Sequence, residues 1–186
     1  MRKMKFNPGF TLLELVIVMA IVAIGVALAV PTYQNVTQRR QTTAQAEELA
    51  AFLAFTQSEA IKKNTPISVE LKYTSANNWC IGAAETLTGC DCKGLGTACT
   101  IEGVFRTMSS ATQEKSSMLS PGSDDVVFAF DPVRGTMIDI DLIPHAFTLQ
   151  SDNAKYELRV DVAPTGRIKI CNSDSNKTVP GFKPCS

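Results

Sequence analysis

The sequence predicts an α+β protein in which one long N-terminal α-helix, first transmembrane and then amphipathic, packs on an antiparallel β-sheet head. Three observations predict it: an apolar run near the start, a one-sided apolar period after it, and short alternating segments between Pro and Gly turns. At 186 residues the chain has room for one membrane segment and one modest domain. We expect the divisions 1–9, 10–31, 32–65 and 66–186, the last being a disulfide-containing head.

The apolar run extends from Phe10 to Val30, and only Thr11 and Glu14 in it are clearly polar. A helix of this length spans roughly 30 Å, which is enough to cross a membrane. Three basic residues precede the run, so the positive-inside rule places the head on the far side of the membrane. A secretory signal peptide usually has a shorter core, and a plain membrane anchor leaves Glu14 unexplained.

Glu14 needs a partner, because a carboxylate in a membrane helix costs about 2.5–3.5 kcal/mol even on lenient insertion scales. Cleavage between Gly9 and Phe10 would provide one. The new α-amino group on Phe10 would be a cation close to Glu14 of the same or a neighbouring subunit.

The segment KMKFNPGFTLLELVIV resembles the prepilin leader of type IV pilins and type II secretion pseudopilins. The resemblance implies that a prepilin peptidase cuts after Gly9, that Phe10 is N-methylated, and that Glu14 registers subunits during assembly. It also implies a bacterial inner-membrane protein with a periplasmic head, which later enters an extracellular pilus or a periplasmic pseudopilus.

After Pro31 the helical pattern becomes one-sided, which indicates an amphipathic helix lying on another element. We expect Pro31 to kink the helix, and Asn64 and Pro66 to end it. The residues that recur at three- and four-residue steps are Leu49, Phe52, Leu53, Thr56, Ala60 and Ile61.

The rest of the chain, beyond the helix, is predicted to form strands. ISVELKY places Ile67, Val69, Leu71 and Tyr73 on one face, VVFAF and MIDIDL flank the turn DPVRG, and YELRVDV and RIKIC flank APTG. At least two hairpins follow from this pattern. The Cys-rich stretch 80–99 and the Ser-rich stretch 107–123 read as loops.

All the cysteines lie beyond the apolar run, which favours disulfides in an oxidising compartment. The sequence alone leaves 15 pairings open for six cysteines. A zinc site would have three close thiolates but no C-x-x-C pair, and the lone His145 is remote, so disulfides are favoured. The six are Cys80, Cys90, Cys92, Cys99, Cys171 and Cys185.

Two further motifs, AFTQSEAIKKN at Ala54–Asn64 and GRIKIC at Gly166–Cys171, resemble the head shared by the GspH, FimT and FimU minor pilins and pseudopilins. Heads of this group stack one or two sheets against the helix. Pilins often pin their C-terminal region with a disulfide, which implies a bond between Cys171 and Cys185.

No catalytic constellation, cofactor motif or metal motif is present, so we expect neither an enzyme nor a cofactor. His145, beside Pro144, reads as a loop residue. Asp139 and Asp141 fit the alternation of an amphipathic strand, with a calcium site a distant second.

The function predicted first is a minor type IV pilin of the pilus tip or priming complex, whose partners are other minor pilins, the major pilin and the prepilin peptidase. A GspH-like pseudopilin of a type II secretion system is the alternative in the same class. The rival class is a DNA-binding minor pilin for natural transformation, because in some FimT-like pilins a motif similar to Gly166–Lys169 captures DNA. Arg167 and Lys169 would contact phosphates there, although a solvated strand face is the favoured interpretation.

Overall fold

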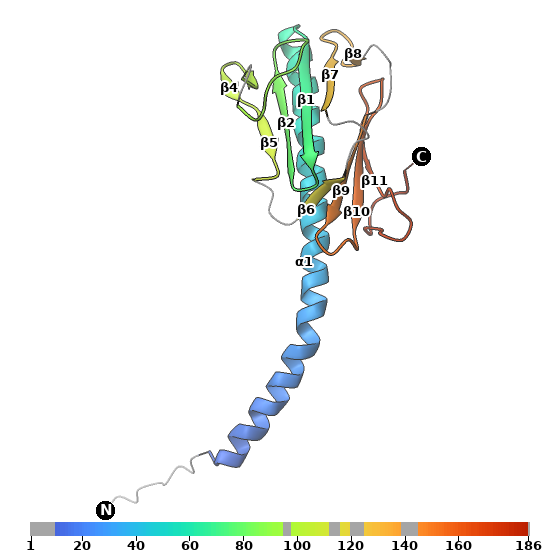
Figure 1. The fold of residues 1–186 in the computed structure, drawn as a ribbon. Helices are drawn as coiled ribbons and strands as arrows, with labels where there is room; N and C mark the ends of the chain where they lie inside the picture. Colours follow the sequence, from blue (N-terminus) through green and yellow to red (C-terminus); the bar gives the residue numbers. More distant parts are fainter. Residues whose placement is uncertain (1–9, 95–97, 112–115, 120–124, 139–144, 186) are drawn as a thin grey trace, which may run out of the picture. The chain divides into compact units, whose positions relative to one another are not determined.

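The computed structural model describes residues 10–94, 98–111, 116–119, 125–138 and 145–185 (Figure 1). Its elements are one helix, α1 (Leu12–Lys63), followed by short strands. The chain divides into two compact units, residues 1–37 and residues 38–186, and α1 contributes to both.

In the first unit Thr11 caps the start of α1. Its hydroxyl accepts a hydrogen bond from the Glu14 backbone N–H (3.2 Å), and its carbonyl accepts one from the Leu15 N–H (3.2 Å). The helix assignment continues through Pro31, and the kink stays a prediction. We expected residues 10–31 to cross a membrane. Within the described ranges, no helix is both long enough and apolar enough to do so.

In the second unit α1 buries one face. Leu49, Leu53, Thr56 and Ala60 are fully buried, as the one-sided period predicts. Ile61 was expected on the same face, but it is 48% exposed because it lies at the edge of the stripe. The helix ends at Lys63, and Asn64 takes the left-handed conformation (φ 51°) that closes a helix C-terminus.

The larger sheet has the order β5-β2-β1-β7-β8. Its central strand β1 (Ile67–Ser75) pairs with β2 (Asn78–Ala84) and with β7 (Asp125–Phe130), both antiparallel. The outer strands are β5 (Thr107–Ser109) and β8 (Met137–Ile138). Alternate residues Ile67, Val69 and Leu71 are fully buried, as predicted.

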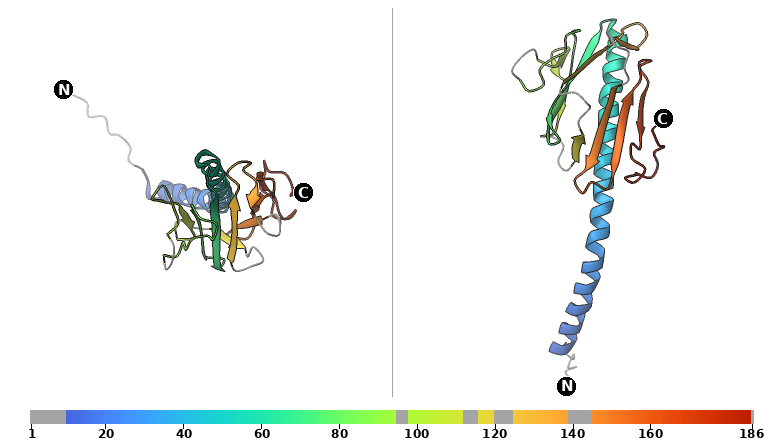
Figure 2. Two further views of the ribbon diagram at one scale, coloured as in Figure 1. Left: turned by 90° about the horizontal axis from the view of Figure 1, so that it is seen from above. Right: turned by 45° about the vertical axis from the view of Figure 1, so that its right-hand side comes forward.

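The second sheet has the order β11-β10-β9-β6. It comprises β6 (Ser116–Leu119), β9 (His145–Ser151), β10 (Glu157–Val162) and β11 (Ile168–Cys171), all paired antiparallel. A further small hairpin joins β3 (Thr100–Ile101) to β4 (Val104–Phe105). Both sheets and the second-unit part of α1 share one hydrophobic core. Figure 2 shows both sheets beside that part of the helix. The predicted α+β fold with antiparallel sheets on a long helix is therefore confirmed.

Three loop predictions were wrong. The Cys-rich stretch begins inside β2, and the Ser-rich stretch contains β5 and β6. His145 is the first residue of β9, and its ring stacks on Phe128 with the centroids 4.8 Å apart. These segments lack the runs of β-branched residues that mark strands in sequence, and burial against the core holds them extended. Asp139 and Asp141 lie outside the described residues.

Candidate functional site

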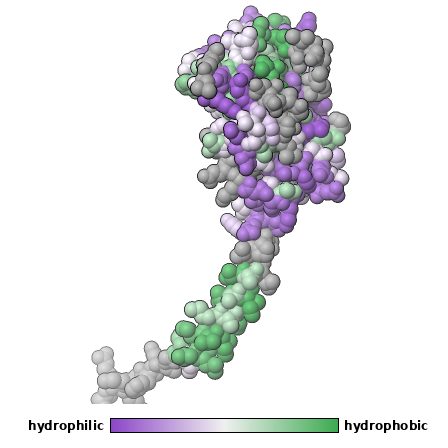
Figure 3. Space-filling view, viewed as in Figure 1, coloured by the Kyte–Doolittle hydropathy of each residue, from purple (hydrophilic) through white to green (hydrophobic). Residues whose placement is uncertain are grey.

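The first candidate site is the start of α1. Gly9, which precedes the predicted cleavage point, lies outside the described residues. Phe10 is 85% exposed, and the large apolar side chains from Leu12 to Val26 are all more than half exposed. Figure 3 shows this stretch as strongly hydrophobic. Glu14 is exposed beside them, so the geometry leaves its carboxylate accessible to another chain.

The second candidate site is a junction centred on Gln57, from the middle of the Ala54–Asn64 motif. Its side-chain amide donates two hydrogen bonds, to the carbonyls of Gly135 (2.6 Å) and Gly166 (2.9 Å). Gly135 lies in the turn between β7 and β8, and Gly166 lies in the turn between β10 and β11. One helix side chain therefore ties a turn of each sheet to α1.

The glycine of the Gly166–Cys171 motif is required by this junction. Gly166 has φ +79°, and a Cβ atom added to it would lie 1.9 Å from the Gly135 carbonyl oxygen. The turns also bond directly, because the Met137 N–H donates to the Pro164 carbonyl (3.0 Å). The two motifs that carry the resemblance thus meet in space, where they build the head.

The basic residues after Gly166 differ in how accessible they are. Arg167 is exposed at the end of the turn, whereas Lys169 is half-buried in β11, opposite Asp161 in the register. The Asp161 carboxylate already accepts two bonds from the Arg159 guanidinium (2.7 and 3.1 Å). Lys177, further along, pairs with Glu157 (3.1 Å). Arg167 therefore remains the more accessible of the two residues proposed to contact DNA.

The C-terminal loop is closed by a disulfide between Cys171 and Cys185, the pair that the resemblance implies. Asn172 organises the loop interior. Its side chain donates to the carbonyls of Val179 (3.2 Å) and Phe182 (2.7 Å) and accepts from the Val179 N–H (2.7 Å). Asn172 therefore links the start of the loop to its far side through three hydrogen bonds.

The other four cysteines form the bonds Cys80–Cys92 and Cys90–Cys99. The second bond lies directly on β2, where a Cβ atom on Gly82 would be 2.3 Å from the Cys99 sulfur. With every cysteine paired, none supplies a thiolate for zinc. Asp161 approaches Cys171 and Cys185, but both sulfurs are in the disulfide and the group cannot hold a metal in that form.

An ion-pair cluster lies at the C-terminal end of α1. Lys63 pairs with Glu85 and with Glu102 (3.3 Å), and the Glu85 carboxylate also accepts the Glu102 backbone N–H (2.9 Å). The hydrogen bond from Lys63 is the main reason that the pKa of Glu85 lies below its ordinary value. The same bond raises the pKa of Lys63. The Glu85 side chain is more than a third exposed, so we assign the cluster no stability value.

Comparison with known proteins shows to which family these features belong. Residues 4–30 match the prokaryotic N-terminal methylation motif, and residues 45–166, about two thirds of the chain, match the family model of type II transport protein GspH. The chain belongs to the GspH family. The resemblance stated from the sequence motifs is therefore confirmed, and the GspH match includes Gln57, Gly135 and Gly166 of the junction.

Among named relatives, the type IV major alpha-pilin of Moraxella bovis is 39% identical over 85 residues, which are 46% of this chain and 54% of that protein. A fimbrial protein of Pseudomonas aeruginosa is 40% identical over 65 residues, which are 35% of this chain and 42% of that protein. The GspH-family chain thus spans about half the length of these relatives.

The crystal structure of the type IV minor pilin FimU of Pseudomonas aeruginosa aligns with a TM-score of 0.50 and 16% identity. The alignment covers 78% of this chain and 97% of that structure. At this identity the likeness shows the fold alone, which is the type IV pilin fold.

Sequence reasoning identified the residues of both motifs but missed the Gln57 junction. Its bonds join residues 78 and 109 positions apart in the chain, and no local pattern encodes such contacts. The signal that could have found it was the pair of turn glycines, because a glycine that ends a Pro-containing turn often marks a close backbone approach.

Proposed function

We propose that this protein is a minor type IV pilin, a structural subunit that joins the pilus tip or priming complex and helps to initiate pilus assembly. The observation that carries the proposal is the exposed apolar helix start, Phe10–Val26, within the methylation motif. The GspH-family head and its FimU-like fold support the same conclusion.

The apolar surface has to be covered, because exposing it to water costs about 25 cal/mol for each Å². On this proposal the bacterial inner membrane covers it first, with the head in the periplasm. Other minor pilins and the major pilin cover it after the subunit is extracted into the filament. Glu14 then pairs with the α-amino group of a neighbouring subunit, which offsets the cost of a carboxylate among apolar side chains.

Processing is tested by mass spectrometry of the native protein from membranes or sheared filaments. We expect the N-terminal peptide to begin at Phe10, with or without one added methyl group. A peptide that begins at Met1, or far beyond Val30, would contradict cleavage by the prepilin peptidase and with it the role of Glu14.

The specific role is tested by deleting the gene and counting surface pili. We expect piliation to fall sharply and to return when the wild-type chain is supplied. Normal pili in the deletion strain would overturn the role in initiation.

A pseudopilin of a type II secretion system is the second candidate, and the match to type II transport protein GspH favours it. The same deletion strain distinguishes the two roles. Loss of secreted proteins with normal pili indicates the pseudopilin, whereas loss of pili with normal secretion indicates the minor pilin.

DNA binding for natural transformation is the third candidate, and the exposure of Arg167 on the hairpin favours it. Phosphate contacts are strongest at low salt. A fluorescent duplex titrated with the full chain at low salt should therefore bind, and both Arg167→Glu and Lys169→Glu should weaken the complex. Equal affinity of the wild type and both variants, or no binding at low salt, would exclude this role for the two residues.

A further inference from the structure

Two segments of the sequence, 35–37 and 176–178, have the form Asn-x-Thr, which is the acceptor motif for N-glycosylation. Neither segment includes the predicted cleavage point or the Gln57 junction. A motif of this kind accepts a sugar only where an enzyme can reach both its asparagine and its threonine. The structure therefore distinguishes between the two segments.

The first motif lies inside α1. Asn35 is half-buried, and the Thr37 hydroxyl donates a hydrogen bond to the Tyr33 carbonyl (3.0 Å). Two residues along an α-helix rotate the side chain by about 200°. Asn35 and Thr37 therefore point to nearly opposite sides of the helix, and one binding site cannot hold both unless the helix unwinds. This motif is a poor acceptor.

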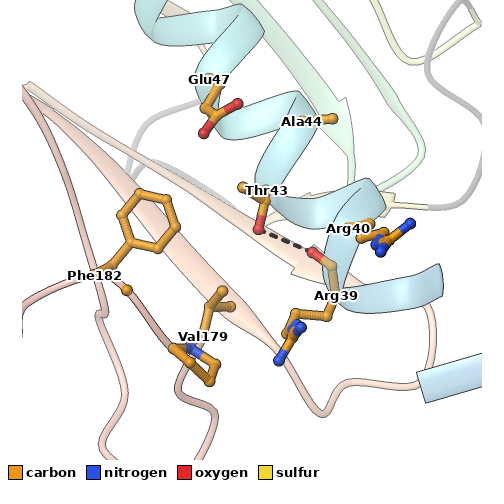
Figure 4. Close-up of a pocket in the computed structure, with 9 residues that line it drawn as sticks. Arg39, Arg40, Thr43, Ala44, Glu47, Val179 and Phe182 are labelled. Atoms are coloured by element: carbon orange, nitrogen blue, oxygen red, sulfur yellow. Dashed lines mark hydrogen bonds between the residues drawn. The ribbon is translucent and has the colours of Figure 1, made fainter. Parts of the chain in front are cut away.

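The second motif lies in the loop closed by the C-terminal disulfide. One part of that loop faces α1, where Val179 and Phe182 line a groove of about 400 Å³ against the helix (Figure 4). Outside the groove, Ser175, Asn176 and Thr178 are all exposed. Within the part of the chain that the structure describes, the side chains of Asn176 and Thr178 make no hydrogen bond. Both side chains are therefore accessible to an enzyme.

A tight turn carries this motif. The Asp174 carboxylate accepts the Asn176 backbone N–H (2.8 Å), and the Asp174 carbonyl accepts the Lys177 N–H (3.3 Å). Lys177 anchors the turn to β10, because its carbonyl accepts the Glu157 N–H (2.9 Å) and its ammonium pairs with the Glu157 carboxylate (3.1 Å). An enzyme that takes the Asn176 side chain meets a segment already bent into a turn, which lowers the entropy cost of binding.

The residue two positions before the asparagine also differs between the motifs. It is Asp174 in the second motif, so the segment 174–178 reads Asp-Ser-Asn-Lys-Thr, whereas it is Tyr33 in the first. Bacterial enzymes that glycosylate asparagine select acceptors with an acid at this position. Proline, which blocks the motif when it follows the asparagine, is absent from 174–178. The second motif therefore has the complete bacterial form.

We propose that Asn176 is an N-glycosylation site whose sugar donor is an oligosaccharide carried on a polyprenyl diphosphate. The side-chain nitrogen of Asn176 forms a bond to the first carbon of the sugar, while the bond from that carbon to the diphosphate oxygen breaks. Polyprenyl diphosphate leaves, and the nitrogen releases one proton to solvent. An oligosaccharyltransferase catalyses this step. The inference rests on the proposed function, in which the head is periplasmic and meets such a donor at the membrane.

Mass spectrometry of the full chain, purified from its native host, tests the site. The disulfides are reduced, the chain is cut with trypsin, and the peptides containing Asn35 and Asn176 are sequenced by electron-transfer dissociation, which leaves sugars attached. We expect the mass of an oligosaccharide on Asn176 and none on Asn35. Unmodified Asn176 in every copy would overturn the proposal. Sugar attached only to hydroxyl groups of the same peptide would overturn it as well.

Variants expressed in the same host test how the motif is recognised. Asn176→Gln and Thr178→Val should each abolish the added mass, because the first moves the acceptor nitrogen and the second removes the hydroxyl that the motif requires. Thr178→Ser keeps a hydroxyl and should remain modified. Asp174→Asn keeps an oxygen that can accept the Asn176 N–H but removes the charge, and it should lower the modified fraction.

The altered side chains lie on the loop, so a count of free thiols serves as the control for folding. It should stay at zero in each variant while the disulfide between Cys171 and Cys185 is intact. Modification that survives Thr178→Val with this disulfide intact would contradict the proposal.

The same digest separates failure of this inference from failure of the proposed function. An N-terminal peptide that begins at Phe10, together with unmodified Asn176, leaves the proposed function without the glycan. An N-terminal peptide that begins at Met1, together with modified Asn176, shows an exported and glycosylated chain that is not processed as a pilin.

Discussion

The Gln57 junction predicts that one side-chain amide contributes a large share of the stability of the head. In Gln57→Met the volume is kept but both bonds are lost, to the carbonyls of Gly135 and Gly166 (2.6 and 2.9 Å). Each hydrogen bond contributes about 1 kcal/mol net, and an acceptor left buried without a donor costs more. Both glycines are buried, so we expect a loss of about 2–3 kcal/mol in the free energy of unfolding.

The assay is urea or thermal unfolding of the full chain in detergent, followed by tryptophan fluorescence. Trp79 is the single tryptophan of the sequence and is 2% exposed in β2, so its emission reports loss of the larger sheet. For a domain of this size the expected loss lowers the melting temperature by about 5–10 °C. Ser58→Ala is the matched control, because the neighbouring Ser58 is exposed and, within the part of the chain that the structure describes, its hydroxyl bonds only to the nearby Phe55 carbonyl (2.8 Å).

The control should change the free energy of unfolding by less than about 0.5 kcal/mol. If Gln57→Met is as mild as Ser58→Ala, the junction does not hold the two turns on the helix and the reasoning is refuted. Gln57→Glu adds a second check. A carboxylate cannot donate to two carbonyls at neutral pH, so this variant should be at least as unstable as Gln57→Met.

Three further predictions concern other parts of the chain. Gly82→Ala should cost about 3 kcal/mol and leave free thiols on titration, because the added methyl group overlaps the Cys99 sulfur at 2.3 Å; an unchanged thiol count with unchanged stability would contradict it. Glu85→Gln should make the free energy of unfolding depend less on pH below neutrality. The pKa of Glu85 is held down by Lys63, so its contribution is complete above the usual glutamate pKa of about 4.3 and is lost as the pH falls through the lower folded value. The comparison is the unfolding midpoint of both chains from neutral pH to about pH 3, and parallel curves would exclude the effect. Glu14→Ala should leave cleavage intact but lower incorporation into filaments, and normal incorporation in sheared pili would count against the pairing of Glu14.

The sequence predicted those parts of the fold in which buried residues recur at a short, regular spacing along the chain. Leu49, Leu53 and Ala60 repeat at helical spacing and are all buried. Ile67, Val69 and Leu71 alternate in β1 and are also buried, although Ser68 and Glu70 between them are buried too. Each pattern is contained in one element, so local sequence is sufficient to reveal it.

The parts that sequence did not predict depend on contacts between distant segments. β9 was missed although Phe147 and Leu149 alternate in it, because the segment begins beside Pro144 and has no run of β-branched residues. The strands within the Ser-rich stretch are set by pairing, with β6 lying against β9. The Gln57 junction joins residues 78 and 109 positions apart, which come together only after both sheets have formed. The pairing of Cys80, Cys90, Cys92 and Cys99 could not be predicted because all four lie in the one Cys-rich stretch and their spacing does not choose among the pairings.

On the proposed function, Glu14 would fix the register between neighbouring helices, which the apolar side chains around it cannot do. Burial of the surface from Phe10 to Val26 is favourable at almost any axial position of a neighbouring helix, because the hydrophobic effect is not directional. It therefore drives association without fixing a register. A charge among apolar side chains is different, since a shift by one residue along the helix rotates it by about 100° away from its partner. On the proposed function, Glu14 near the start of the helix would thus discriminate between registers that the apolar surface cannot tell apart. Glu14→Gln should therefore leave the amount of membrane-bound protein unchanged while reducing ordered assembly. A variant that lowers both equally would show that the charge acts on folding and not on register.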